Sequence, residues 1–148
     1  MKRTKLTKMP PLQKASPQTP PGFHLLVKPS GAACNLDCKY CFFLSKEMLY
    51  PGSNIRMTDE MLRIYIRQSL DSQQTSEISI NWQGGEPTLM GLNFFRRSVD
   101  YVEKFKSPGQ PVLYTIQTNG TKIDKDWAAF LKQHNFLELE YGWTKGIA

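Results

Sequence analysis

From residue 23 onward, the apolar and polar positions of the chain follow two different periods. Three short runs are mainly apolar, as β-strands are, while three longer stretches repeat apolar residues every three or four positions, as α-helices do. The predicted strands are 23–30, 77–82 and 111–118, and the predicted helices are 59–73, 92–106 and 124–134. The first strand, FHLLVKPS, is predicted to be buried and to end at Pro29.

The helix boundaries have recognisable signals. Thr58 is a predicted N-cap, and the acidic residues Asp59 and Glu60 follow it in the first turn, where negative charge suits the helix dipole. Ser107-Pro108-Gly109 ends the second helix. The apolar face of that helix is predicted to consist of Phe94, Phe95, Val99, Val102 and Phe105.

The elements follow one another as strand, loop and helix three times. This order is typical of parallel strands joined by crossover helices and predicts an α/β fold. In such folds the functional site gathers at the carboxyl ends of the strands. Three unusual segments fall at those ends, namely Cys34–Cys41, Gly84–Pro87 and Thr118–Gly120.

Composition adds a distinct N-terminal segment. Residues 1–22 contain five of the ten prolines and little apolar periodicity, so we expect a flexible lead. Residues 1–28 carry six basic side chains and no acidic one, which accounts for the whole net charge of +6. Because the remainder is balanced, the charge argues against a nucleic-acid-binding face. No apolar run approaches the length of a membrane span, and no apolar stretch typical of a secretory signal follows the basic start.

The stretch CNLDCKYC holds all three cysteines, Cys34, Cys38 and Cys41. An odd, clustered set fits a reducing compartment, so we expect a cytoplasmic protein. A zinc site would need a fourth ligand from His24 or His134, which lie in a predicted strand and at a predicted helix end. A [4Fe–4S] cluster normally takes one cysteine per iron, so three would leave one iron open for a small chelating ligand.

The other two segments each allow two interpretations. Gly84-Gly85-Glu86-Pro87 is either a simple turn or a place where backbone and Glu86 approach a cationic amine. Asn119 either forms part of a turn or points its side chain into the same site at the carboxyl ends of the strands.

Taken in order, CNLDCKYCF, WQGGEPTL and TIQTNGT resemble the radical S-adenosylmethionine (SAM) superfamily, in particular the anaerobic sulfatase-maturating enzymes. The resemblance implies the N-terminal part, about three βα units, of a partial (β/α)6 barrel. It implies that Cys34, Cys38 and Cys41 hold a [4Fe–4S] cluster and that S-adenosylmethionine binds the open iron. The residues expected at this second cofactor are Tyr40 near the adenine, Gly84, Gly85 and Glu86 near the amino group, and Asn119.

In that family a 5′-deoxyadenosyl radical abstracts hydrogen from a Cys or Ser of a sulfatase peptide, which becomes Cα-formylglycine. The resemblance therefore implies a sulfatase-type peptide or protein substrate and an electron donor as partners, without nucleic acid or membrane. Two alternatives remain. One is a non-catalytic iron–sulfur or zinc-binding module, and the other is a gene product without stable function.

The resemblance covers residues 23 to about 137, so the expected organisation is a lead (1–22), a truncated radical SAM core (23–137) and a tail outside the family (138–148). The family's fourth strand is expected where the chain has ELEYGWTKGIA, and a shift of reading frame near residue 137 would explain the difference. Such a core would leave the edge of the third strand open, with impaired or no turnover.

Overall fold

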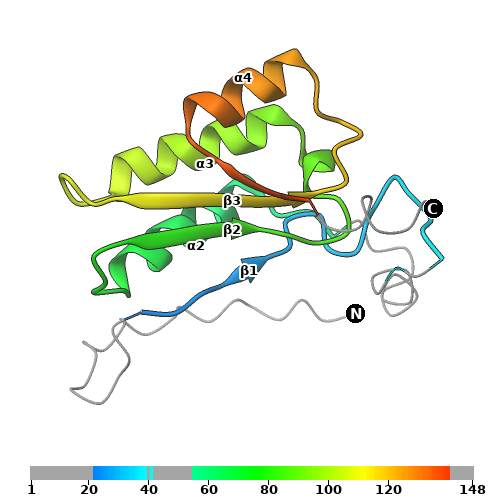
Figure 1. Ribbon diagram of the computed structural model, residues 1–148. Helices are drawn as coiled ribbons and strands as arrows, with labels where there is room; N and C mark the ends of the chain where they lie inside the picture. The colour runs from blue at the N-terminus through cyan, green and yellow to red at the C-terminus, as the bar shows by residue number, and fades with distance from the viewer. Residues whose placement is uncertain (1–21, 40, 42–54, 141–148) are drawn as a thin grey trace, which may run out of the picture.

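The computed structural model describes residues 22–39, 41 and 55–140, and over these it forms one parallel sheet covered by helices (Figure 1). The strands lie in the order in which they occur along the chain. Neighbouring strands are parallel throughout, and Trp82 pairs with Ile116 near the carboxyl ends of the two central strands. The strands are β1 (Leu26–Val27), β2 (Ile78–Trp82), β3 (Val112–Thr118) and β4 (Leu137–Glu140). The predicted α/β class is confirmed.

The helices begin and end within two residues of the predicted positions, because their end signals are local. The hydroxyl of Thr58 accepts the N–H of Met61 at 3.2 Å, and the carboxylate of Asp124 accepts the N–H of Trp127 at 2.9 Å. The helices are α2 (Asp59–Asp71), α3 (Leu92–Phe105) and α4 (Lys125–Gln133), and a short 3₁₀ helix, η1 (Pro87–Met90), precedes α3. Among the described residues, no helix is long and apolar enough to cross a membrane.

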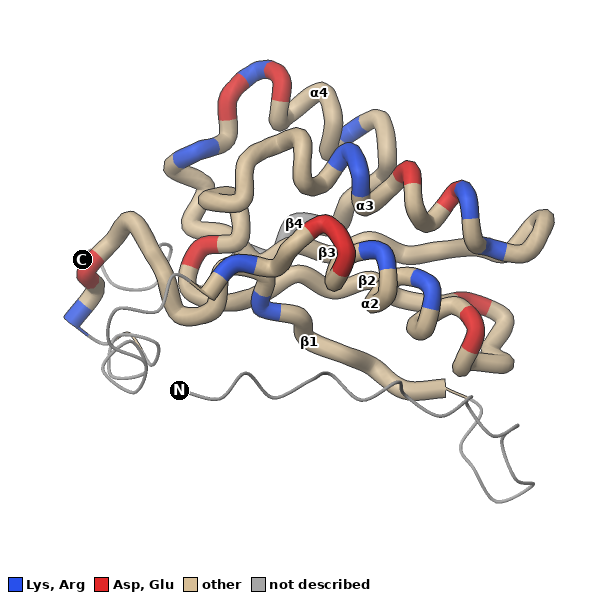
Figure 2. Tube along the Cα trace, turned by 180° about the vertical axis from the view of Figure 1, so that it is seen from behind, with Lys and Arg blue, Asp and Glu red and all other residues tan. Residues whose placement is uncertain are grey.

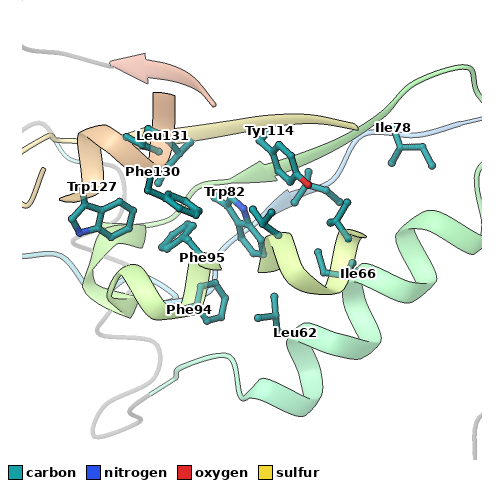
Figure 3. Packing of buried hydrophobic residues seen from close by; sticks show 14 of the residues in the cluster. Leu62, Ile66, Ile78, Trp82, Phe94, Phe95, Tyr114, Trp127, Phe130 and Leu131 are labelled. Carbon is teal, nitrogen blue, oxygen red and sulfur yellow. The ribbon is translucent and has the colours of Figure 1, made fainter. Parts of the chain in front are cut away.

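One apolar cluster joins the helices to a single face of the sheet (Figure 3). Trp82 of β2 lies at its centre, and its ring meets Phe94 and Phe95 of α3 edge-on at centroid distances of 5.4 and 5.8 Å. Trp127 extends the cluster to α4, with its ring 5.0 Å from Phe95. The predicted apolar face of α3 is buried except for Phe105, which is half-buried. This core holds the carboxyl ends of β2 and β3 at fixed positions.

The first strand differs from the prediction. It is only two residues long, and Phe23, Leu25 and Leu26 are 41%, 43% and 63% exposed. The expectation of a buried strand is wrong because β1 lies at the edge of the sheet and pairs only with β2 among the described residues. An apolar run of this length does not by itself distinguish a central strand from an edge strand.

The expectation that the edge of the third strand is open is also wrong. β4 pairs with β3 in parallel, from Thr115 beside Leu137 to Thr118 beside Glu140. The predicted boundary at residue 137 therefore falls inside a strand, and the assignment of 138–148 to a separate tail stays a prediction.

Tyr114 lies in the core with its hydroxyl buried and without a hydrogen-bond partner among the described residues. Its ring stacks on Phe136 at 4.9 Å, so the aromatic contact does not need the hydroxyl. Tyr114→Phe is expected to raise the free energy of unfolding by about 1 kcal/mol, because an unsatisfied polar group leaves the core. Urea denaturation at pH 7 measures this difference.

The advantage of Tyr114→Phe should grow at alkaline pH. Burial raises the pKa of Tyr114 above its ordinary value near 10, and the charge of Glu103 adds to the effect. Above pH 10 the unfolded chain therefore loses this proton more readily than the folded chain, and Tyr114→Phe does not share this loss of stability. Tyr101→Phe provides the contrast at pH 7, because that hydroxyl donates to Asp59 at 2.7 Å, so its removal should bring no gain in stability. A destabilised Tyr114→Phe chain would contradict the prediction.

Candidate functional site

Three loops meet where the parallel strands end (Figure 1). The N–H of Gln83 donates to the carbonyl of Val27 at 2.8 Å, so the loops after β1 and β2 leave the sheet side by side. The N–H of Asn119 donates to a carboxylate oxygen of Glu86 at 2.7 Å, which joins the loop after β3 to the loop after β2. The expected meeting of the three segments at one edge of the sheet is confirmed.

The cysteine-bearing loop lies directly on the backbone that follows β2. The N–H of Gly85 donates to the carbonyl of Gly31 at 3.0 Å, and the N–H of Glu86 donates to the carbonyl of Ala33 at 2.8 Å. A Cβ atom on Gly85 would overlap the carbonyl oxygen of Ala33. We expected the glycines to admit a ligand, and in this structure Gly85 admits the backbone of the cysteine loop.

Position 84 also requires glycine, for a reason of its own. Its φ of +136° is a conformation that residues with a side chain rarely adopt, and a Cβ atom there would lie 2.8 Å from the carbonyl oxygen of Gly31. Both glycines therefore serve the same contact between the two loops.

Glu86 is fully buried at the junction of the loops. Its Oε1 accepts the N–H of Thr88 at 2.9 Å and the hydroxyls of Thr88 and Thr118 at 2.6 and 2.7 Å. Its Oε2 accepts the N–H of Asn119, and its backbone carbonyl accepts the hydroxyl of Ser30 at 3.1 Å. The role that the structure shows for this carboxylate is to hold the loops together. Its expected role toward an amine stays a prediction.

Three side chains close a ring of hydrogen bonds between the cysteine loop and the end of β3. The amide of Asn119 donates to Asn35 at 3.1 Å, the amide of Asn35 donates to the hydroxyl of Thr121 at 2.7 Å, and that hydroxyl donates back to Asn119 at 2.7 Å. Each bond in such a ring polarises the next. The ring fixes the residue that directly follows Cys34.

The three cysteines are half-buried and form no disulfide. The Sγ of Cys34 accepts the backbone N–H of Leu36 at 3.4 Å and the side-chain amide of Asn119 at 3.7 Å. The N–H of Cys41 donates to the carbonyl of Cys38 at 2.8 Å, which makes a tight turn between the second and third thiols. Tyr40, expected near an adenine, lies outside the described residues.

The side chains that could bind a metal indicate which kind of metal centre fits this site. No three described His, Cys, Asp or Glu side chains converge closely enough to hold one metal ion. His24 shares a hydrogen bond with Ser79 at 2.9 Å, and the ring of His134 lies 4.8 Å from that of Phe130, so both histidines are engaged elsewhere. In a cubic cluster each cysteine binds a different iron, so the three thiols need not converge on one point. The three thiols and the donors at Cys34 fit such a cluster better than a zinc ion.

The polar residues that support the motifs were not found from sequence. Their signal is weak, since an isolated Ser, Thr or Asn in a loop is ordinary. Asn35 and Thr118 lie in segments that we had singled out, but neither was assigned a role. These supporting residues are Ser30, Asn35, Thr88, Thr118 and Thr121.

A further feature missed from sequence is the polar face of the sheet opposite the helices. Gln83 donates to Gln117 at 2.7 Å, and Thr115 donates to Asn81 at 2.9 Å. The alternation of polar and apolar residues in ISINWQ and YTIQT is the signal that would have found it.

Along the described helices, basic and acidic residues are interspersed (Figure 2).

Comparison with known proteins agrees with this geometry. The sequence model of the radical SAM superfamily matches residues 29–142. The chain is 37% identical over 125 residues to a serine-type anaerobic sulfatase-maturating enzyme of Klebsiella pneumoniae, covering 83% of this chain and 31% of that protein. It is 38% identical over 119 residues to a cysteine-type enzyme of Clostridium novyi (strain NT), covering 76% of this chain and 30% of that protein.

A solved structure has the same fold over the matched part. Native anSMEcpe with bound AdoMet and the Kp18Cys peptide superimposes with a TM-score of 0.69 at 38% identity, covering 77% of this chain and 30% of that chain. The chain thus spans about a third of the length of these relatives. Because the superfamily model matches most of its residues, the three cysteines included, the chain belongs to the radical SAM superfamily.

Proposed function

We propose that this chain holds a [4Fe–4S] cluster through Cys34, Cys38 and Cys41 and binds S-adenosylmethionine beside it. The observation that carries the proposal is the docking of the cysteine loop onto Gly85 and Glu86 through two backbone hydrogen bonds of 3.0 and 2.8 Å. This docking brings the cysteine segment and the glycine segment side by side, which supports one shared site for both cofactors. The membership of the chain in the superfamily supports the same interpretation.

The residues of the chain have separate roles in this proposal. The cysteines hold the cluster, whose chemistry when reduced is to supply the electron that cleaves S-adenosylmethionine to a 5′-deoxyadenosyl radical. Gly84 and Gly85 keep the backbone close enough for both motifs to serve one ligand pair. Glu86 and Asn119 hold the loops in register, and Tyr40 is proposed to lie near the adenine.

The wider part of the proposal concerns the reaction. The relatives are named sulfatase-maturating enzymes, and one solved relative contains AdoMet and a peptide. We therefore propose that the complete reaction oxidises a Cys or Ser of a sulfatase-type peptide to Cα-formylglycine, with a cytoplasmic electron donor. Because the chain spans about a third of these relatives, cluster and S-adenosylmethionine binding are the functions proposed for these residues themselves.

Anaerobic reconstitution with iron and sulfide tests the proposal. We expect about four irons per chain, since one cube forms on the three thiols. We also expect S-adenosylmethionine to change the electron paramagnetic resonance (EPR) spectrum of the reduced cluster, because it binds the iron that the cysteines leave open. Release of 5′-deoxyadenosine after addition of a reductant would extend the result to cleavage.

A chain with all three cysteines replaced by alanine is the matched control and should bind no cluster. One zinc per chain would favour the metal-binding module instead. A chain that stays unfolded after reconstitution would favour a product without stable function, and either result would overturn the proposal.

A further inference from the structure

We propose that Asn119 sets the reduction potential of the cluster by donating a hydrogen bond from its side-chain amide to the Sγ of Cys34. The inference rests on the proposed function, because Cys34 must bind the cluster. It changes the role expected from sequence, where Asn119 was assigned to the mouth that receives S-adenosylmethionine. In the structure its amide nitrogen lies 3.7 Å from the Sγ of Cys34.

The orientation of the Asn119 amide follows from its neighbours. Its Oδ1 accepts the backbone N–H of Thr121 at 3.0 Å, and a backbone N–H can only donate. The Nδ2 group must therefore face the other way, toward Cys34 and Asn35. A flipped amide would set its NH₂ against the N–H of Thr121 and lose the hydrogen bond.

The backbone of Asn119 is held as firmly as its side chain. Its N–H donates to the fully buried carboxylate of Glu86 at 2.7 Å, and that carboxylate also accepts the hydroxyl of the preceding Thr118. The ring formed with Asn35 and Thr121 fixes the side chain from the other direction. The donor is thus in place before any cluster binds, so no rearrangement is needed to reach the sulfur.

Cys34 receives a second donor from its own loop, the backbone N–H of Leu36 at 3.4 Å. Two N–H groups on one half-buried sulfur suit a thiolate, which carries the negative charge that they stabilise. Hydrogen bonds to the sulfurs are among the main factors that tune iron–sulfur potentials. Reduction adds one negative charge to the cluster, so the donors stabilise the reduced form more than the oxidised form and raise the potential.

Two substitutions test this role. Asn119→Asp keeps Oδ1 for Thr121 but replaces the donor to Cys34 by an oxygen, while Asn119→Ala removes the donor without adding charge. We expect both to make the midpoint potential more negative, measured by EPR-monitored redox titration of the reconstituted chain. The expected change is a tenfold lower ratio of reduced to oxidised cluster at a fixed potential, which is about 59 mV for a one-electron couple.

Asn93→Asp is the matched control for charge, because Asn93 is exposed on α3 and its side chain contacts Arg96. It should load iron and titrate like the unmodified chain. Asn119 variants that load iron with an unchanged potential would overturn the inference. So would loss of iron from both variants, which would show that Asn119 only supports the loop.

These outcomes differ from a failure of the proposed function. If the unmodified chain forms no cluster, the proposed function itself is wrong. If the unmodified chain and Asn93→Asp form the cluster, the potentials of the Asn119 variants alone decide whether Asn119 tunes the cluster.

Discussion

Replacing Gly85 with alanine is expected to detach the cysteine loop and to abolish most cluster loading. A Cβ atom at this position would overlap the backbone carbonyls of Ala32 and Ala33, which are part of the main chain and cannot rotate away. The loop must therefore move, and the hydrogen bonds from Gly85 to Gly31 and from Glu86 to Ala33 are lost. Overpacking and the two lost hydrogen bonds together cost on the order of 3 kcal/mol.

The measurement combines iron per chain after reconstitution with urea denaturation. Because the aromatic core lies between the helices and the sheet, we expect the far-ultraviolet circular dichroism of Gly85→Ala to change little while its iron content falls. Gly109→Ala is the control, since Gly109 has a φ of +76° but its Cβ atom would meet no described atom within 4 Å. Its cost is only backbone strain of about 1 kcal/mol, with full iron loading. Equal iron contents in the two variants would show that the docking of the cysteine loop does not require glycine at position 85.

Replacing Glu86 with alanine is expected to lower the free energy of unfolding by roughly 3–5 kcal/mol, because buried donors lose a charged acceptor. The hydroxyls of Thr88 and Thr118 can rotate, whereas the backbone N–H groups of Thr88 and Asn119 cannot. The junction between the loops after β2 and β3 should then loosen. Urea denaturation measures the loss, and amide hydrogen exchange at Asn119 localises it.

Glu86→Gln keeps the shape of the side chain but removes its charge and turns one of its two acceptors into a donor. Its carbonyl oxygen can take the place of Oε1, but its amide then meets the N–H of Asn119, so one donor faces another. We expect an intermediate loss of about 1–3 kcal/mol. Glu103→Gln removes a partly exposed ion pair with Lys106 and should change stability by less than about 1 kcal/mol. If Glu86→Gln were as stable as Glu103→Gln, the carboxylate would not hold the junction.

Most elements of the fold were predictable because their signals are local. The helices α2 and α4 start where Thr58 and Asp124 cap them, and the apolar residues of α3 recur at helical spacing. The strands β2 and β3 lie almost where their apolar runs indicated. The edge position of β1 and the pairing of β4 were not predictable, since both depend on which strands lie beside them.

The sequence by itself determined the order of the first three strands and of the three α-helices, the superfamily and the three thiols of the proposed cluster. The reason is that periodicity, caps and the cysteine spacing lie within short segments. Only the tertiary structure decided that Glu86 is buried, that Gly85 admits the cysteine loop and that Asn119 faces Cys34. The physical reason is the parallel register of β2 and β3, which pairs Trp82 with Ile116 and so brings the residues just beyond both strands together. A hydrogen bond between positions more than thirty residues apart has no signal in either segment alone.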